Sequence, residues 1–353
     1  MNKQRLLKKI QEDETISNCS IKGLDLSRMN LTGVRFENVH FINVNFTSAK
    51  IVKTGFKNCS FKKVIFNSID FEGLFWQDMK VNKCLFLDAN LSKCTFFKMD
   101  FSGSYFKNAN LSQATFAESV FEKVKFEQTN CDKATFSKGE MKDSVFLNSD
   151  LLSTTLFKLD MSGTKFVKTN LVKVVLMECA LAEQNFENAT LNMVQFNGSD
   201  LSKTNFDGAD LAQTNFYQCN LEGSSFKDIK ANHAIFMETN LKLTDFQGAY
   251  LYQSNFESAK LEFTNFESAN IEQTYFVSAT CKETNFQNAN AKYANFSHAT
   301  FEKVYLRDAN MSHALVHEII LIDTNLNQAN CFGLRKTDSD LLEAEQFKYT
   351  QGS

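Results

Sequence analysis

The sequence of 353 residues contains no proline and only one tryptophan, and its formal net charge is just −3. An average proline content of about 5% would give roughly 17 prolines, so we infer a fold whose turns offer proline no place. A net charge near zero selects neither a polyanionic nor a polycationic partner. The hydrophobic fraction of 43% and the charged fraction of 22% exclude a disordered chain.

Long apolar runs and catalytic motifs are missing as well. Residues 1–14 are rich in basic side chains but hold no apolar stretch of signal-peptide length, and no later segment approaches a membrane span. We therefore expect a cytoplasmic protein, with signal-independent secretion left open. The chain has no GxSxG, P-loop, HExxH or dinucleotide-binding motif. We expect it to be no enzyme and to use no cofactor.

Phenylalanine is abundant, with 36 copies, and its spacing is regular. Every fifth residue from Ile21 to Cys331 is apolar without a skipped register, and 30 of these 63 positions are Phe while 19 are Leu. Small residues such as Ala109 and Ala114 stand two positions earlier. Neither a helix nor a flat strand repeats its inward residue every five. A chain that turns one corner per five residues does.

A second, longer period is superimposed on the first. Phe recurs at every twentieth position from Phe46 to Phe286, and a column offset by ten, from Phe36 to Phe296, is Phe with few exceptions. Four sides per coil, with aromatic side chains stacked on two opposite sides, would produce this pattern. A two-sided coil also fits a ten-residue period, so the pattern favours four sides and leaves two open.

Blocks such as Ala209-Asp210-Leu211 and Ala289-Asn290 carry a resemblance to the pentapeptide-repeat family over residues 21–331. The resemblance implies an all-β fold, a right-handed four-sided parallel β-helix of about 16 coils with short helical caps. We expect an N-terminal basic capping helix within 1–15, formed by residues 3–11, and the β-helix over 16–335. We expect a C-terminal capping or dimerisation helix within 336–353, with Ser339 or Asp340 as its N-cap. Members of this family often dimerise through a C-terminal segment. The candidate contacts for a homodimer, or for a cap, are Leu341, Leu342 and Phe347.

The cysteines and histidines suggest no chemistry. All nine cysteines fall on predicted inward positions and none forms a CxxC pair, which is typical of buried, inert thiols. We expect His298 and His317 to project outward, with Glu318 beside His298 in a weak surface ion pair. A metal site would need further ligands that the pattern does not supply. We predict no metal site.

Apolar residues at predicted outward positions form the one irregularity in the repeat. They fall in two consecutive coils and on three sides, where other coils carry polar residues. Scattered surface apolar residues are the alternative explanation. We call this set the apolar collar and predict that it binds a partner; its members are Val145, Leu147, Leu152, Phe157, Val167, Val172, Val175 and Met177.

Two functions follow from these patterns. The first is a non-enzymatic protein-interaction scaffold, a binding rod whose protein partner the sequence does not name and which could be a bacterial effector. The second, implied by the resemblance, is a DNA mimic that binds gyrase or topoisomerase and confers quinolone or toxin protection. Residues 101–331 hold 19 basic and 27 acidic residues, a net charge of −8. Duplex DNA of the same length carries far more negative charge, because it has one charge per about 1.7 Å. The lysines of the first 100 residues lie on several sides, so we do not expect nucleic-acid binding.

Overall fold

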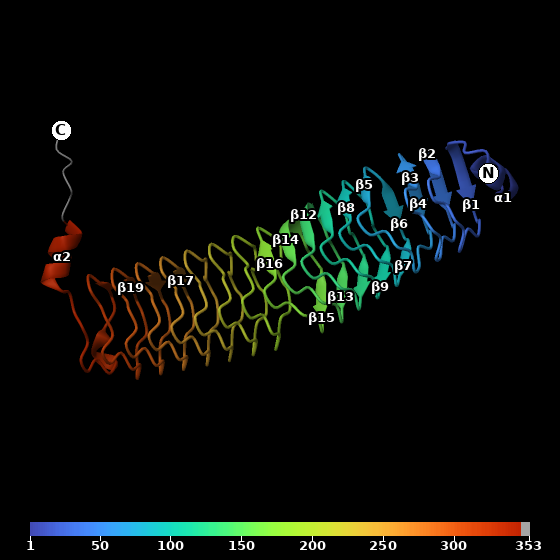
Figure 1. Ribbon diagram of the computed structural model, residues 1–353. Coiled ribbons are helices and arrows are strands. Elements are labelled where there is room, and N and C mark those ends of the chain that lie inside the picture. The colour runs from blue at the N-terminus through green and yellow to red at the C-terminus, as the bar shows by residue number, and fades with distance from the viewer. Residues whose placement is uncertain (347–353) are drawn as a thin grey trace, which may run out of the picture. The chain divides into compact units, whose positions relative to one another are not determined.

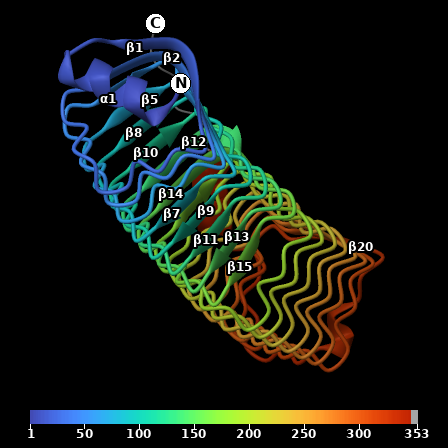
Figure 2. The same ribbon diagram turned by 90° about the vertical axis from the view of Figure 1, so that its right-hand side faces the viewer.

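The computed structural model describes residues 1–346. The chain folds into two compact units, Met1–Gln184 and Asn185–Ser353. We call them the N-terminal and the C-terminal unit and describe each by itself. Both are built from short parallel strands and bridges stacked coil on coil (Figures 1 and 2). The all-β parallel helix expected from the sequence is confirmed within each unit.

The N-terminal unit begins with helix α1 (Lys3–Gln11), as expected for residues 3–11. The side chain of Asn2 caps this helix by accepting the Arg5 backbone N–H at 2.9 Å, and Leu6 is fully buried. The strands that follow are β1 (Ile16–Lys22), β2 (Arg35–Ile42), β3 (Gly55–Lys57), β4 (Ser60–Lys62), β5 (Phe75–Gln77), β6 (Lys80–Asn82), β7 (Leu85–Leu87), β8 (Thr95–Phe97), β9 (Tyr105–Lys107), β10 (Thr115–Ala117), β11 (Lys125–Glu127), β12 (Thr135–Glu140), β13 (Val145–Leu147), β14 (Thr155–Asp160), β15 (Lys165–Val167) and β16 (Val175–Met177).

These strands form three parallel sheets, with orders β1-β2-β4-β6 (β3 also pairs with β2), β16-β14-β12-β10-β8-β5 and β15-β13-β11-β9-β7. The C-terminal unit holds one sheet of order β17-β18-β19-β20, and most of its other contacts between coils are single parallel bridges. Its elements are β17 (Lys260–Glu262), β18 (Thr280–Lys282), β19 (Thr300–Glu302), β20 (Ile320–Ile322), the 3-10 helix η1 (Leu326–Gln328) and helix α2 (Ser339–Gln346).

The strand register sets the length of a coil, because each paired residue meets the twentieth residue after it. Within one coil of the N-terminal unit there are four pairing positions, one at every fifth residue. They are Asp25 with Asn45, Asn30 with Lys50, Arg35 with Gly55, and His40 with Ser60. Four sides are therefore confirmed, and the two-sided alternative is wrong.

The backbone donors of one repeat explain the absence of proline. Every N–H from Asn45 to Ala49 has a partner. Asn45 donates to the preceding coil, Phe46 and Ser48 donate to the following coil, and Ala49 donates to the Phe46 carbonyl. Thr47 donates to the side-chain oxygen of Asn45 at 2.9 Å. Proline has no N–H and would leave one of these bonds unmade wherever it stood.

The corners are left-handed. From Ile21 to Leu321, the residue two positions after each inward residue of the five-residue series has a positive φ, for example 56° at Ser48 and 52° at Asn58. This conformation costs a non-glycine residue about 1–2 kcal/mol. Proline is excluded from it, because the pyrrolidine ring fixes φ at a negative value. The hydrogen bond from the Ser48 N–H to the next coil, at 2.9 Å, helps to offset that cost.

Stacked rings fill the core of each unit. In the N-terminal unit the Phe126 ring lies parallel to those of Phe106 and Phe146, with centroids 5.3 and 4.5 Å away. In the C-terminal unit Phe206 stacks on Phe226 at 4.6 Å. The predicted columns, in which every twentieth residue is aromatic, are confirmed. Such stacks add about 0.5–1.5 kcal/mol per pair to the free energy of burial.

The small inward residues form a second internal ladder. Their hydroxyl groups donate to carbonyls of the preceding coil, as Thr54 does to the Leu31 carbonyl at 2.7 Å. Cysteine thiols take the same role, since the Sγ of Cys94 lies 3.0 Å from the Phe71 carbonyl. Ser, Thr and Cys are therefore interchangeable here because each is small and can donate.

Two expectations about the C-terminal end need correction. Leu321, predicted to be inward, is 42% exposed, and Cys331 is only half-buried, as Cys19 is near the other end of the chain. A residue of a terminal coil is covered by a neighbouring coil on one side only. Helix α2 is capped by Asp338, whose carboxylate accepts the N–H groups of Asp340 and Leu341, and not by Ser339 or Asp340 as the sequence suggested.

Candidate functional site

The apolar collar lies at repeat positions that point away from the core of the N-terminal unit. The strand register places Leu147 beside Val167 in β13 and β15, and Phe157 beside Met177 in β14 and β16. Val167 is 40% exposed, and the other seven members are half-buried. The register thus brings these two pairs together in adjacent coils, as the sequence indicated, and binding of a partner by the collar remains a prediction. Because β13 and β14 belong to different sheets, the collar follows the surface around the coil.

A network of charges borders the collar on the β11 side. The carboxylate of Glu127 accepts the Tyr105 hydroxyl at 2.6 Å and pairs with the ammonium groups of Lys107 and Lys125. The hydrogen bond from Lys125, with those from Tyr105 and Lys107, lowers the pKa of Glu127 to about 2. Glu127 lies directly beside Leu147 in the register of β11 and β13. An ordered set of charges thus adjoins an apolar surface.

The cysteines have the environment that the sequence predicted for inert thiols. Seven of the nine are buried. Burial raises the pKa of the Cys84 thiol to about 12 and that of Cys94 to about 11. Thiolates are the reactive form, so these residues are protonated donors within the hydroxyl ladder and not nucleophiles.

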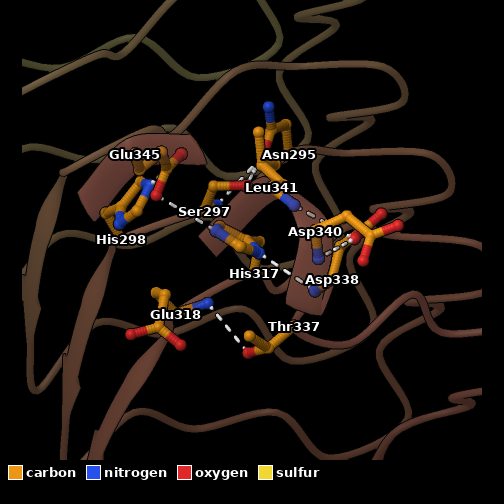
Figure 3. A network of polar contacts seen from close by, with 10 residues as sticks. All are labelled: Asn295, Ser297, His298, His317, Glu318, Thr337, Asp338, Asp340, Leu341 and Glu345. Atoms are coloured by element: carbon orange, nitrogen blue, oxygen red, sulfur yellow. Dashed lines mark hydrogen bonds and ion pairs between the residues drawn. The ribbon is translucent and has the colours of Figure 1, made fainter. Parts of the chain in front are cut away.

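The histidines near the C-terminal end depart most from the sequence prediction. His317, expected to be outward, is fully buried. Its Nε2 lies 3.2 Å from one carboxylate oxygen of Glu345, and the Nε2 of His298 lies 3.3 Å from the other (Figure 3). Glu318, the expected partner of His298, bonds instead through its backbone N–H to Thr337. The partner of both histidines is Glu345, on α2.

This cluster joins α2 to the last coils of the C-terminal unit. The ligand atoms of His298, His317 and Glu345 all lie within 4.8 Å of one another, a spacing that a metal ion could use. The hydrogen bond from His317 lowers the pKa of Glu345. On its other side, His317 accepts the Asp338 backbone N–H at Nδ1. The repeat register does not extend to residue 345, so no pattern in the sequence indicated its position.

The C-terminal contact candidates are only partly described. Leu341 is 43% exposed and Leu342 is half-buried, both on α2, while Phe347 lies outside the described residues. Among residues 1–346, no helix is both long and apolar enough to cross a membrane.

Comparison with models of known protein families identifies the repeat. The model of the pentapeptide repeat region matches residues 157–226 and 209–286, and the model of pentapeptide repeats in eight copies matches 16–47, 104–143 and 279–317. Together the matches cover more than half of the chain. No curated protein matches it.

Several solved structures of repeat proteins are similar to the chain. HetL, a pentapeptide repeat protein involved in heterocyst differentiation regulation from the cyanobacterium Nostoc sp. strain PCC 7120, is 17% identical, with 71% of this chain and 90% of that chain covered and a TM-score of 0.26. A trypsin-treated form of QnrB1, a plasmid-mediated fluoroquinolone resistance protein, is 18% identical, with 51% of this chain and 89% of that chain covered and a TM-score of 0.35. Rfr23, a pentapeptide repeat protein from the cyanobacterium Cyanothece 51142, is 19% identical, with 48% of this chain and 87% of that chain covered and a TM-score of 0.18.

Proposed function

Because this chain belongs to the pentapeptide-repeat family, we propose that it is a non-enzymatic scaffold that binds a protein partner through its outward side chains. The apolar collar is the observation that carries this proposal. Its eight residues interrupt a surface that is otherwise polar at most of the same repeat positions. Exposed apolar groups that adjoin an ordered polar rim are typical of protein interfaces.

The same proposal includes that the protein catalyses no reaction, and two observations support this part. The thiols have raised pKa values, and the backbone donors of each repeat bond to neighbouring coils or to corner side chains. The outward columns are then the parts of each coil that remain for recognition.

Substitution within the collar tests the proposal. The triple variant Leu152→Ser, Phe157→Ser and Val172→Ser removes three collar side chains without changing the inward register. Its matched control carries Ala212→Ser, Tyr217→Ser and Asn232→Ser, which occupy the same three repeat positions three coils further on. We expect the collar variant to lose partner recovery in affinity capture from the native host, and the control to retain it. Equal recovery by wild type, collar variant and control would refute the collar as the binding surface.

We further propose that α2, with Leu341 and Leu342, caps the last coil or forms a homodimer contact. The half-burial of Leu342 and the bonds of Glu345 to two histidines support docking of this helix on its own unit. Light scattering of the Leu341→Ser, Leu342→Ser double variant separates the two roles. A halved mass indicates a dimer contact, whereas an unchanged mass with lower stability indicates a cap. No change in either would exclude both.

A further inference from the structure

The paired strand triplets of one sheet in the N-terminal unit carry no charged residue. In the sheet β5-β8-β10-β12-β14-β16, the outward side chains of these triplets are Phe75, Gln77, Thr95, Phe97, Thr115, Ala117, Thr135, Ser137, Thr155, Phe157, Val175 and Met177. We call this surface the uncharged face. In the sheet β7-β9-β11-β13-β15, by contrast, charged residues such as Lys107, Lys125 and Glu127 stand at the outward positions. In a chain that is 22% charged, six adjacent triplets without a charge are unusual, although β12 and β14 continue beyond their triplets into charged residues.

On the uncharged face two half-buried aromatic side chains, which we call the walls, flank a row of small half-buried side chains, which we call the floor. Phe97 on β8 and Phe157 on β14 stand at the same repeat position, and β10 and β12 lie between their strands. The floor consists of small side chains, namely Thr115, Ala117, Thr135 and Ser137. Three strand spacings separate the walls by about 14 Å. An α-helix with its side chains is about 10–12 Å wide, so a helix fits between them.

Both walls are held in the same way. The ammonium group of Lys98 lies 5.0 Å from the centre of the Phe97 ring, and that of Lys158 lies 5.0 Å from the centre of Phe157. Lys98 also pairs with Glu118 at 3.8 Å, and Lys158 with Glu178 at 3.0 Å. Cation–π contacts of this kind restrict the rings, and the ion pairs with Glu118 and Glu178 balance the charges of the two lysines.

The C-terminal unit shows that the corresponding face accepts a helix. The repeat register gives His317 the position of Ser137 on the floor, and His298 the position of Lys138 at the adjoining corner. Both histidines bond to the carboxylate of Glu345 on α2, at 3.2 and 3.3 Å (Figure 3). His317 is fully buried, whereas Ser137 is half-buried. A helix that carries a glutamate thus already packs on this side of the repeat.

Lys138 stands at the corresponding corner of the N-terminal unit. It is exposed, and within residues 1–346 no carboxylate forms an ion pair with it. At the same corner position Lys158, one coil further on, pairs with Glu178, and Glu118, one coil before, pairs with Lys98. By analogy with His298 and Glu345, this ammonium group is placed to meet an acidic side chain, or the C-terminal end of a helix, where partial negative charge accumulates.

We propose that the uncharged face binds an α-helix of a partner protein across β10 and β12, between Phe97 and Phe157. The helix presents small or apolar uncharged side chains to the floor and a carboxylate to Lys138. This inference rests on the proposed scaffold function and specifies the chemistry of its partner. Charged side chains on the contacting side of the helix are excluded, because the floor offers them no opposite charge and would remove them from water.

Site-specific photo-crosslinking in the native host tests the inference on the full chain. The probe p-benzoylphenylalanine is placed at Ser137 on the floor, at the exposed Lys62 on β4 of another sheet as control, and at Leu152 in the collar. We expect crosslinks at Ser137 to exceed those at Lys62 by about fivefold or more. The crosslinked peptide should map to a helical segment of another protein with an uncharged side and a carboxylate near its contact. A probe at Thr135 serves as a second floor position if the Ser137 variant does not fold.

Charge reversal at Lys138 provides the matched variant. An exposed ion pair contributes up to about 1 kcal/mol, or fivefold in affinity, so Lys138→Glu should lower the Ser137 crosslink yield by about fivefold, while Lys138→Arg retains it. Crosslinks at Leu152 without any at Ser137 or Thr135 would overturn the inference and leave the scaffold function standing. A crosslink to a second copy of this chain, or to a strand or loop, would also overturn it. No crosslink at any of these positions would overturn both proposals.

Discussion

The buried imidazole of His317 accepts a hydrogen bond at Nδ1 from the backbone N–H of Asp338, at 3.1 Å. A nitrogen that accepts carries no proton, so the neutral ring has its proton on Nε2, the atom that faces Glu345. A metal-binding histidine has the reverse arrangement, because it donates from the nitrogen that does not bind the metal. The hydrogen bond from Asp338 to His317 therefore argues against a metal site. It favours a hydrogen-bonded contact of His298 and His317 with Glu345, which we call the clamp.

We accordingly expect Zn²⁺ to leave the thermal unfolding of the protein unchanged. A site filled at 100 times its dissociation constant would add about 2.7 kcal/mol of stability, which calorimetry with and without the ion would detect. The comparison variants are His317→Ala and Glu345→Gln, which should weaken docking of α2 equally with and without Zn²⁺. A rise in the unfolding midpoint that needs Zn²⁺ and disappears in both variants would contradict the clamp.

The pKa of Glu127 makes the N-terminal unit sensitive to acid. Hydrogen bonds from Lys125, Tyr105 and Lys107 lower this pKa to about 2, against about 4.3 in an unfolded chain. A depressed folded-state pKa stabilises the fold above the unfolded value, and that stability is lost as the pH falls from about 4.3 to about 2. Thermal unfolding followed against pH should show a difference between wild type and Glu127→Gln at pH 6 that shrinks over this window. A difference that stays constant down to pH 2 would be inconsistent with the network.

Truncation of a stacked phenylalanine should be costly. Phe126 is fully buried between Phe106 and Phe146, so Phe126→Ala removes two ring contacts and leaves a cavity. We expect a loss of about 3–5 kcal/mol in the free energy of unfolding, measured with a chemical denaturant. Phe126→Leu should cost less, because leucine occupies the same repeat position elsewhere. The exposed Gln128 is the control, and a loss from Phe126→Ala as small as that from Gln128→Ala would refute the inward register.

Gly139 is a glycine at which an added methyl group would meet backbone atoms rather than a side chain that can move. A Cβ there would overlap the backbone oxygen of Ser119. We expect Gly139→Ala to destabilise the N-terminal unit by about 1–3 kcal/mol through local displacement of β12. Gly55 is the matched control, since nothing lies within 4 Å of its Cβ position. Equal unfolding midpoints for the Gly139→Ala and Gly55→Ala variants would show that β12 can shift without cost.

The repeat itself was predictable because a single rule governs each position within the coil. One large and one small inward residue per repeat each have a fixed partner one coil away, so Phe126 or Thr54 could be placed without coordinates. The rule fails where a neighbouring coil is missing. Leu321 follows the pattern yet is 42% exposed, because no complete coil covers it.

The contact between α2 and the histidines could not be predicted for a related reason. His317 occupies an outward repeat position, and its burial comes from a segment outside the register. The apolar collar was visible in the sequence because its members violate the rule for outward residues. The uncharged face violates no rule at any single position, and only the pairing of the strands brings its members together.

The pairing of each coil with the next also bears on how such a chain can change in length. Each coil forms backbone bonds to the coils directly before and after it, and all donors of a repeat such as Asn45–Ala49 are used within those two contacts or inside the repeat itself. Removal or duplication of one whole coil inside either unit would therefore join surfaces that already match. A gene encoding this protein can lengthen or shorten each unit in whole coils, while the backbone pairing and the inward register of the remaining coils are kept.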